Sequence, residues 1–157
     1  MQLTGKEILD KGIITGSCTE GLQQQGIDLR IKDIKIVTGV GCIPSEGKTE
    51  LPFYDPYELG YVEPGYYEIT FEEGCKIPNN CSLHLKTRSS LARCGAIIHS
   101  GQFDAGFETD SMGAFLHAIK PIKIEKGARV AQAIVFQSSD VENLYDGQWQ
   151  NDKQRDL

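Results

Sequence analysis

The most informative stretch of this chain is Lys86-Thr87-Arg88-Ser89-Ser90-Leu91-Ala92-Arg93-Cys94-Gly95. It puts two guanidinium groups and two adjacent hydroxyls on one tight turn. Arg side chains match the geometry of phosphate oxygens, and backbone N–H groups at a helix start favour anions. Asp104 follows nine residues after Gly95, and a carboxylate there can activate a water or hold a metal. The stretch therefore predicts a polyphosphate site and hydrolysis of a nucleotide or a similar phosphorylated molecule.

The segments around this stretch are short and strand-like. Thr4 and Glu7 form a capping-box pattern that predicts a short helix ending at Gly12 or Gly16. Alternating apolar residues and Gly or Pro turns predict strands at 27–31, 34–36, 66–71, 83–87, 96–99, 114–119, 122–124 and 129–136. A second short helix is expected at 89–93. We therefore expect a mainly β fold: a sandwich, jelly roll or distorted barrel with one or two short helices.

Length and charge narrow the possible functions. The 157 residues are enough for one domain, 1–157, and the polar tail 143–157 is expected to be mobile. A net charge of −6 argues against general nucleic-acid binding, yet a small anionic ligand needs only a local basic pocket. No apolar run is long enough to span a membrane, and the N-terminal residues lack a signal-peptide core. We therefore expect a cytoplasmic protein without a membrane or nucleic-acid partner.

Each candidate residue also has an ordinary structural interpretation. Ser89 and Ser90 fit the N-cap of a short helix, and Asp104 fits a solvated turn. Asp28 shares a strand face with Arg30, as in any half-buried strand. Gln132 lies in an apolar run, where a Gln is either an internal hydrogen-bonding group or a ligand contact. Taken singly, these positions leave the choice open.

Together, four segments resemble the motif series of the dUTPase and dCTP deaminase superfamily, in the same chain order. They are Gly26-Ile27-Asp28-Leu29, Arg88-Ser89-Ser90-Leu91-Ala92-Arg93, Phe103-Asp104-Ala105-Gly106-Phe107 and residues 127–136. The likeness is greatest to archaeal-type dUTP diphosphatases. It implies a distorted jelly-roll (β-clip) fold that assembles as a homotrimer, with active sites at subunit interfaces.

The resemblance also implies a role for each matching residue. Asp104 is the expected catalytic base, and Asp28 is expected to hold Mg²⁺ through water. Phe107 is expected to pack under the deoxyribose and to exclude a 2′-hydroxyl, although a core Phe fits equally well. The expected phosphate contacts are Arg88, Ser89, Ser90, Arg93 and Gln132. The expected nucleoside contacts are Ile98, His99, Phe103, Phe107 and the lid residue Trp149.

One position separates the two chemistries of the superfamily. Deaminases carry a Glu ten residues after the third-motif Asp, and that Glu transfers protons at the cytosine amino group. Here the corresponding residue is Ala114, which cannot transfer a proton. The expected function is therefore hydrolysis of dUTP to dUMP and pyrophosphate, which limits uracil incorporation into DNA. The alternatives are a dCTP deaminase or bifunctional enzyme using another carboxylate, a non-catalytic nucleotide-binding protein, and an enzyme for a modified pyrimidine triphosphate.

Overall fold

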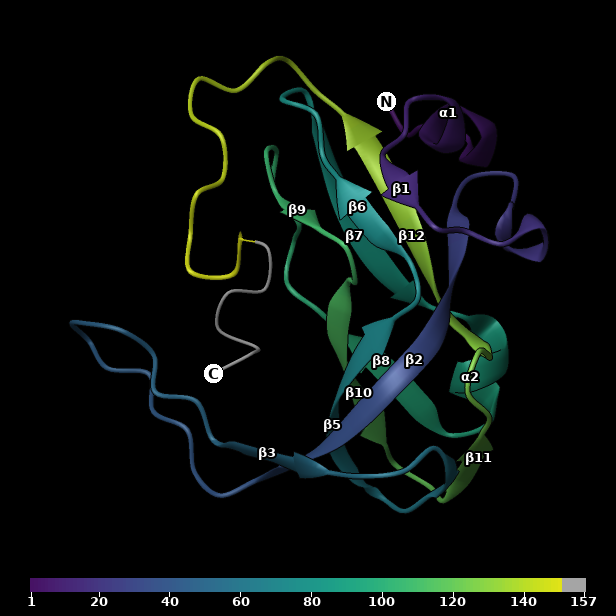
Figure 1. The fold of residues 1–157 in the computed structure, drawn as a ribbon, viewed down its shortest axis with the longest axis vertical. Helices are drawn as coiled ribbons and strands as arrows, with labels where there is room; N and C mark the ends of the chain where they lie inside the picture. The colour runs from purple at the N-terminus through teal and green to yellow at the C-terminus, as the bar shows by residue number, and fades with distance from the viewer. Residues whose placement is uncertain (151–157) are drawn as a thin grey trace.

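The computed structural model describes residues 1–150, which form a barrel-like β structure with short helices at its periphery (Figure 1). The first half comprises α1 (Gly5–Asp10), β1 (Ile14–Thr15), the 3₁₀ helix η1 (Thr19–Gly21), β2 (Ile27–Thr38), β3 (Phe53–Pro56), β4 (Gly60–Val62), β5 (Gly65–Phe71) and β6 (Gly74–Lys76). The second half comprises β7 (Cys81–Thr87), α2 (Ser89–Arg93), β8 (Ala96–His99), β9 (Glu108–Thr109), β10 (Gly113–Ala118), β11 (Ile122–Ile124) and β12 (Arg129–Gln137). The mainly β prediction is confirmed.

The main sheet nearly closes on itself. Its strand order is β7-β12-β2-β5-β10-β8, with β3 added to β2, and two small sheets, β1-β6-β9 and β11-β4, complete the fold. The edge strands β7 and β8 meet where the Ile98 N–H donates to Thr87 Oγ1 at 2.9 Å. Beside them, Leu83 and Phe103 exchange two backbone hydrogen bonds of 2.9 and 3.0 Å. This closure fixes the loop that follows β8, and that loop carries Asp104.

Local sequence explains most elements. The capping box forms as expected, with Glu7 N–H donating to Thr4 Oγ1 at 3.2 Å and Thr4 N–H donating to Glu7 Oε1 at 3.0 Å. The strands predicted at 27–31 and 34–36 are one strand, β2, in which the register with β5 shifts between Ile31 and Asp33. A bulge of this kind interrupts the apolar alternation without ending the strand. Sequence patterns missed β1, β3, β4, β6 and β9, which are only two to four residues long.

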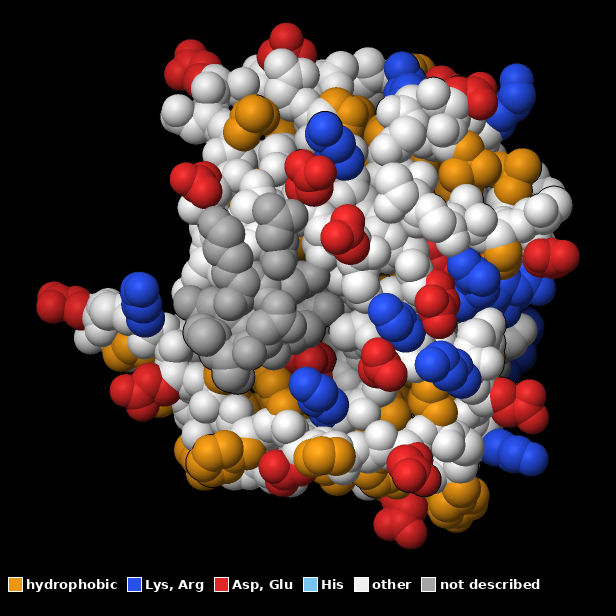
Figure 2. Space-filling view, viewed as in Figure 1, with side chains coloured by type: hydrophobic (Ala, Val, Ile, Leu, Met, Phe, Trp, Pro, Cys, Tyr) orange, Lys and Arg blue, Asp and Glu red, His pale blue; other side chains and the backbone are white. Residues whose placement is uncertain are grey.

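Three further features describe the periphery and surface of the molecule. The connection between β2 and β3 extends from the body as a long hairpin, joined at the Cys42–Glu50 bridge (Figure 1). Within residues 1–150, no helix is long and apolar enough to cross a membrane. Acidic and basic side chains are interspersed over the visible face, and Lys and Arg gather at the edge beside α2 (Figure 2).

Candidate functional site

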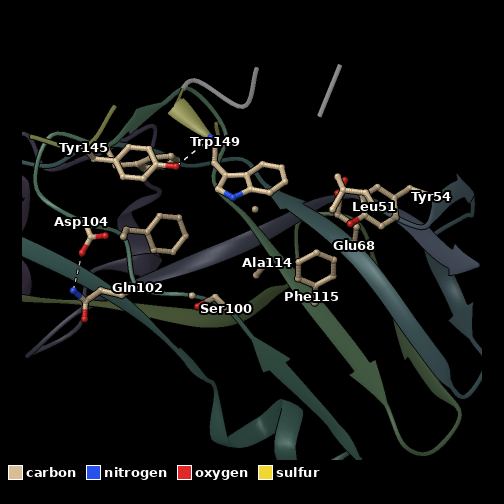
Figure 3. A pocket seen from close by; sticks show the side chains of 14 residues that line it. Leu51, Tyr54, Glu68, Ser100, Gln102, Asp104, Ala114, Phe115, Tyr145 and Trp149 are labelled. Atoms are coloured by element: carbon tan, nitrogen blue, oxygen red, sulfur yellow. Dashed lines mark hydrogen bonds between the residues drawn. The ribbon is translucent and has the colours of Figure 1, made fainter. Parts of the chain in front are cut away.

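A pocket of about 380 Å³ lies against the outer face of the β5–β10 part of the main sheet. The loop after β8 supplies one wall, and the C-terminal segment lies over it (Figure 3). Its lining residues are Leu51, Tyr54, Glu68, Ser100, Gly101, Gln102, Phe103, Asp104, Phe107, Gly113, Ala114, Phe115, Tyr145 and Trp149. A concave site rich in aromatic side chains, with a few polar groups, is typical of small-molecule binding.

The Asp104 turn is held rigidly. The Phe107 N–H donates to the Asp104 carbonyl at 3.1 Å, and the Gly106 N–H donates to the Ile77 carbonyl at 2.9 Å. Gly106 has φ of 90°, a conformation that favours glycine in a turn. A Cβ atom there would lie 2.6 Å from the Leu144 Cβ atom. The turn thus requires the glycine that follows Asp104-Ala105, and it leaves the Asp104 carboxylate exposed to the pocket.

Asp104 has one polar neighbour and a wall of aromatic rings. Gln102 Nε2 donates to Asp104 Oδ1 at 2.8 Å, which orients the carboxylate (Figure 3). The Phe103 and Phe107 ring centroids are 5.4 Å apart, and Tyr145 contacts Phe107 edge-on at the same distance. Phe107 is buried, so its ring forms a fixed flat surface beside the carboxylate.

The C-terminal segment is tied to this turn. The Tyr145 N–H donates to the Ala105 carbonyl at 2.7 Å. Gln150 donates from Nε2 to the Gly106 carbonyl at 2.9 Å and accepts from the Glu108 N–H at 2.8 Å. The Trp149 N–H donates to the Tyr145 hydroxyl at 3.1 Å, which places the indole against the pocket (Figure 3). The predicted mobility of 143–157 stays a prediction, and 151–157 lie outside the described residues.

A second polar cluster surrounds Asp28 on β2. Asp28 is only 1% exposed, and its carboxylate meets Arg88 Nε at 3.3 Å and Arg129 Nη1 at 3.2 Å. Gln23 Nε2 donates to Oδ2 at 3.0 Å, and Gln132 Nε2 donates to Oδ1 at 3.3 Å. A buried carboxylate needs such partners. Asp28 is therefore buried, although the alternation of side chains along a strand also allows a solvated position.

Strand pairing assembles this cluster. Gln132 on β12 is directly opposite Asp28 on β2 and opposite Lys86 on β7. A register shift between Arg129 and Ala131 accompanies the contact of the Arg129 side chain with Asp28. Arg88, at the N-cap of α2, also donates from Nη1 to the Arg129 carbonyl at 2.9 Å. The first, second and fourth sequence motifs thus meet at one place.

The structure separates the predicted site residues into groups. Asp104, Phe103, Phe107 and Trp149 line the pocket. Asp28, Arg88 and Gln132 form the second cluster, and Ser89, Ser90 and Arg93 lie exposed on the adjoining helix α2. The other two predicted site residues, Ile98 and His99, lie outside the pocket and the second cluster. The Ile98 side chain is in the core, and His99 lies on the outer sheet face 6.2 Å from the Tyr66 ring. Their role in nucleoside binding stays a prediction.

Several pocket and cluster residues were not predicted. Arg129 at Asp28 lies within the fourth motif but had no predicted role, whereas the others lie outside the four motifs: Gln23 at Asp28, and Tyr54, Glu68, Phe115 and Tyr145 in the pocket. The sequence contains no distinguishing signal for Glu68, because charged residues also alternate with apolar ones along the central strand β2. Burial, reinforced by the negative charge of Glu68, raises the pKa of the Tyr54 phenol above its ordinary value, so Tyr54 stays neutral.

Comparison with known sequences identifies the family. The model of the dCTP deaminase-like family matches residues 3–139. A Methanocaldococcus jannaschii protein named deoxyuridine 5'-triphosphate nucleotidohydrolase is 35% identical over 135 residues, covering 82% of this chain and 86% of that protein. A Methanosarcina mazei protein named "probable deoxyuridine 5'-triphosphate nucleotidohydrolase" is 32% identical over 140 residues, covering 83% and 81%.

Solved structures share the fold. A dCTP deaminase from Agrobacterium tumefaciens superposes with a TM-score of 0.65 at 15% identity, over 85% of this chain and 47% of that one. A variant dUTPase of Staphylococcus bacteriophage 80alpha with the nucleotide dUpNHpp gives 0.51 at 14% identity, over 86% and 97%. With the family match and the archaeal identities, these findings show that the chain belongs to the dCTP deaminase-like family, alongside the archaeal dUTP nucleotidohydrolases.

Proposed function

We propose that this chain is a Mg²⁺-dependent dUTP diphosphatase that forms dUMP and pyrophosphate. The observation that carries the proposal is the exposed carboxylate of Asp104 in an aromatic pocket that Ala114 also lines. Ala114 occupies the position at which deaminases carry their proton-transferring Glu, so the pocket has a base for water at Asp104 but no such group on β10. The names of the archaeal relatives support the same reaction. Such an enzyme keeps uracil out of DNA, and we place it in the cytoplasm.

In this proposal, Asp104 accepts the proton of the water that attacks a phosphorus atom. An ionised carboxylate within one hydrogen bond of the water is sufficient. The hydrogen bond from Gln102 fixes which oxygen of Asp104 remains available. Phe107 lies under the deoxyribose and excludes a 2′-hydroxyl, because its buried ring cannot move aside.

The cluster at α2 binds the triphosphate. Ser89 and Ser90 are exposed beside Arg88, and their hydroxyls can donate to phosphate oxygens. Arg88 and Arg129 share the single carboxylate of Asp28, which leaves positive charge for a polyanion. This charge stabilises the leaving pyrophosphate. Arg93, in the last turn of α2, adds a further positive charge.

Replacing Arg88 with Ala should weaken binding of a non-hydrolysable dUTP analogue about ten- to a hundredfold, the effect of losing a charge-assisted hydrogen bond. Isothermal titration calorimetry measures the change. Lys123→Ala, an exposed cation on β11, is the matched control and should bind normally. An unchanged affinity in Arg88→Ala would show that other residues bind the phosphates.

The chemistry of the cluster fits a hydrated Mg²⁺ that arrives with the triphosphate. Among residues 1–150, no three His, Cys, Asp or Glu side chains converge as direct ligands. The amide oxygen of Gln132 is a hard oxygen atom that suits contact with the waters that Mg²⁺ retains, whereas the buried Asp28 carboxylate accepts from Gln132 Nε2 and so orients that amide. When bound, the ion neutralises phosphate charge. Pyrophosphate release from dUTP should require Mg²⁺, stop on addition of EDTA and return with excess Mg²⁺; release unaffected by EDTA would refute this role.

We also propose a homotrimer whose sites are shared between subunits. In one chain, the Asp104 pocket and the Asp28 cluster are separate: among the described residues, no side chain of the cluster lines the pocket. The nucleotide needs the base-activating carboxylate and the phosphate grip together. A partner subunit whose cluster faces the pocket supplies this arrangement. Sedimentation should therefore show a trimer.

Trp149 is expected to act as a lid. Its indole lines the pocket but is 40% exposed, so a bound nucleoside should cover it further. Because it is the only Trp in the chain, its emission reports on this site alone. A non-hydrolysable dUTP analogue should change the emission, and Trp149→Phe should abolish the signal. No change in a protein shown to bind the analogue would contradict the lid.

A further inference from the structure

The side-chain amide of Gln150 holds the backbone on both sides of Phe107. Gln150 Nε2 donates to the Gly106 carbonyl at 2.9 Å, and Gln150 Oε1 accepts from the Glu108 N–H at 2.8 Å. The same Nε2 also donates to the Tyr145 carbonyl at 3.1 Å. A Gln amide has one accepting oxygen and one donating nitrogen, so both of its ends are used here on main-chain groups.

Gln150 takes the place that a further strand would have beside Phe107. On one side of this segment, the Ile77 N–H donates to the Phe107 carbonyl at 3.0 Å, and the Ile77 carbonyl accepts from the Gly106 N–H at 2.9 Å. On the other side, β9 begins at Glu108 and is the edge strand of the sheet β1-β6-β9. An edge strand has backbone groups without a strand partner, and Gln150 pairs with the first of them. The backbone around Phe107 is therefore held by the body of the molecule on one side and by the C-terminal segment on the other.

This arrangement also bears on the ring of Phe107. The ring is buried between Phe103 and Tyr145, and Tyr145 belongs to the same C-terminal segment as Gln150. Without Gln150, the backbone of that segment would remain tied to the turn through the Tyr145 N–H and the Ala105 carbonyl. A wall that excludes a single hydroxyl group must stay within roughly 0.5 Å of its place. Gln150 supplies part of that precision, although it does not itself line the pocket.

We infer that Gln150 is a positioning residue for the choice of sugar: it holds Phe107 where the ring excludes a 2′-hydroxyl. The inference rests on the proposed function, which places the deoxyribose on Phe107. Gln150 acts through the backbone of Gly106 and Glu108 and needs no contact with the nucleotide. The chemical step depends on Asp104, which Gln102 orients separately. A change at Gln150 should therefore alter the choice between deoxyribonucleotides and ribonucleotides more than it alters kcat.

The test compares dUTP and UTP as substrates of the full chain. Gln150→Met keeps an unbranched side chain of similar length and removes the amide. It should lower the ratio of kcat/KM for dUTP to kcat/KM for UTP about tenfold, the effect of losing hydrogen bonds that hold the wall. The change should arise mainly in KM, with kcat for dUTP altered no more than about threefold. A role limited to stability would instead lower kcat for both nucleotides through a smaller active fraction, with KM and the ratio unchanged.

Two further variants complete the comparison. Gln150→Ala removes the amide and the side-chain bulk, and it should lower the ratio at least as much as Gln150→Met. Asn143→Ala removes an exposed amide from the same C-terminal segment, outside the pocket, and should keep the ratio of the unaltered protein. A ratio that falls in Gln150→Ala but not in folded Gln150→Met would overturn the inference, because packing rather than the amide would then position Phe107.

Calorimetric binding of dUMP and UMP separates this inference from the reaction. The unaltered protein should bind dUMP more tightly than UMP, and Gln150→Met should lose most of that preference. This result in a protein that does not hydrolyse dUTP would refute the proposed function and support the role of Gln150. A preference that Gln150→Met retains would overturn that role. Equal affinity of the unaltered protein for dUMP and UMP would overturn it as well, because there would be no choice of sugar for Gln150 to support.

Discussion

Asp104→Asn is expected to lower kcat for dUTP about 10²- to 10⁴-fold, the usual contribution of a general base, while nucleotide affinity changes little. Asn has the same size as Asp and can keep a hydrogen bond with Gln102, so the turn and its aromatic wall stay in place. The amide cannot accept the proton of the attacking water. Steady-state pyrophosphate release measures kcat, and calorimetry with a non-hydrolysable analogue measures the dissociation constant.

Asp110→Asn is the matched control for this experiment. Asp110 is an exposed carboxylate six residues further along the chain and outside the pocket. It should turn over dUTP as the unaltered protein does. Retained turnover in Asp104→Asn would remove Asp104 from its proposed role. A parallel loss of affinity would instead give it a role in binding.

Arg30→Met is expected to lower the free energy of unfolding by about 3–5 kcal/mol at neutral pH, the usual cost of leaving a buried charge unpaired. Glu73 is fully buried, and Arg30 Nε donates to its Oε1 at 2.8 Å. The Arg30 N–H donates to Oε2 at 2.9 Å, and Arg30 Nη2 donates to the Gly16 carbonyl at 2.6 Å. The pair ties β2 to the segment before β6, and the substitution removes the two side-chain hydrogen bonds together with the charge, while the backbone N–H still donates to Glu73.

The loss in the free energy of unfolding of Arg30→Met should depend on pH. Burial raises the pKa of Glu73 above its ordinary value, and Arg30 opposes that effect. Without Arg30 the pKa of folded Glu73 rises further, so folding then favours the protonated carboxyl. The stability linked to that proton is present below the unfolded-state pKa of Glu73 and is lost as pH rises through its folded-state pKa. Arg30→Met should therefore be least destabilised at acid pH and most destabilised above the raised pKa.

Urea unfolding at one fixed protein concentration measures the effect at neutral and acid pH. The double variant Arg30→Met/Glu73→Gln should recover much of the loss at neutral pH, since no buried charge remains. Lys6→Met breaks only the exposed pair with Asp10 at 3.8 Å and should change stability little. An Arg30→Met loss that is equal at both pH values would show that packing, rather than the unpaired charge, determines it.

Much of the fold could be predicted because its long elements follow local rules. The strand predicted at 66–71 coincides with β5 except at Gly65, and Thr4 and Glu7 define the start of α1 through hydrogen bonds within one turn. The short strands β1, β3, β4, β6 and β9 could not be predicted in this way. β9, for example, is two residues long and exists because it pairs with β6, which is far away in sequence. Pairing between distant segments leaves no periodic signal.

The candidate site was likewise predictable only in part. The motifs predicted that Asp28, Arg88 and Gln132 act together, and the structure brings them into contact. Sequence could not show that Asp28 is buried under two guanidiniums, because Arg129 reaches it only through the register of β12. Glu68 belongs to no motif, and only the closure of the sheet places it in the same pocket as Asp104.

Separate incubation with dUTP and with dCTP in the presence of Mg²⁺ tests the proposed function most directly. Nucleotide products are resolved by chromatography, and ammonia is measured in the same samples. The expected result is dUMP and pyrophosphate from dUTP, with dCTP unchanged, because Ala114 cannot transfer a proton to the cytosine amino group. Release of ammonia from dCTP without pyrophosphate from dUTP would contradict the account and make the chain a deaminase that uses a different carboxylate.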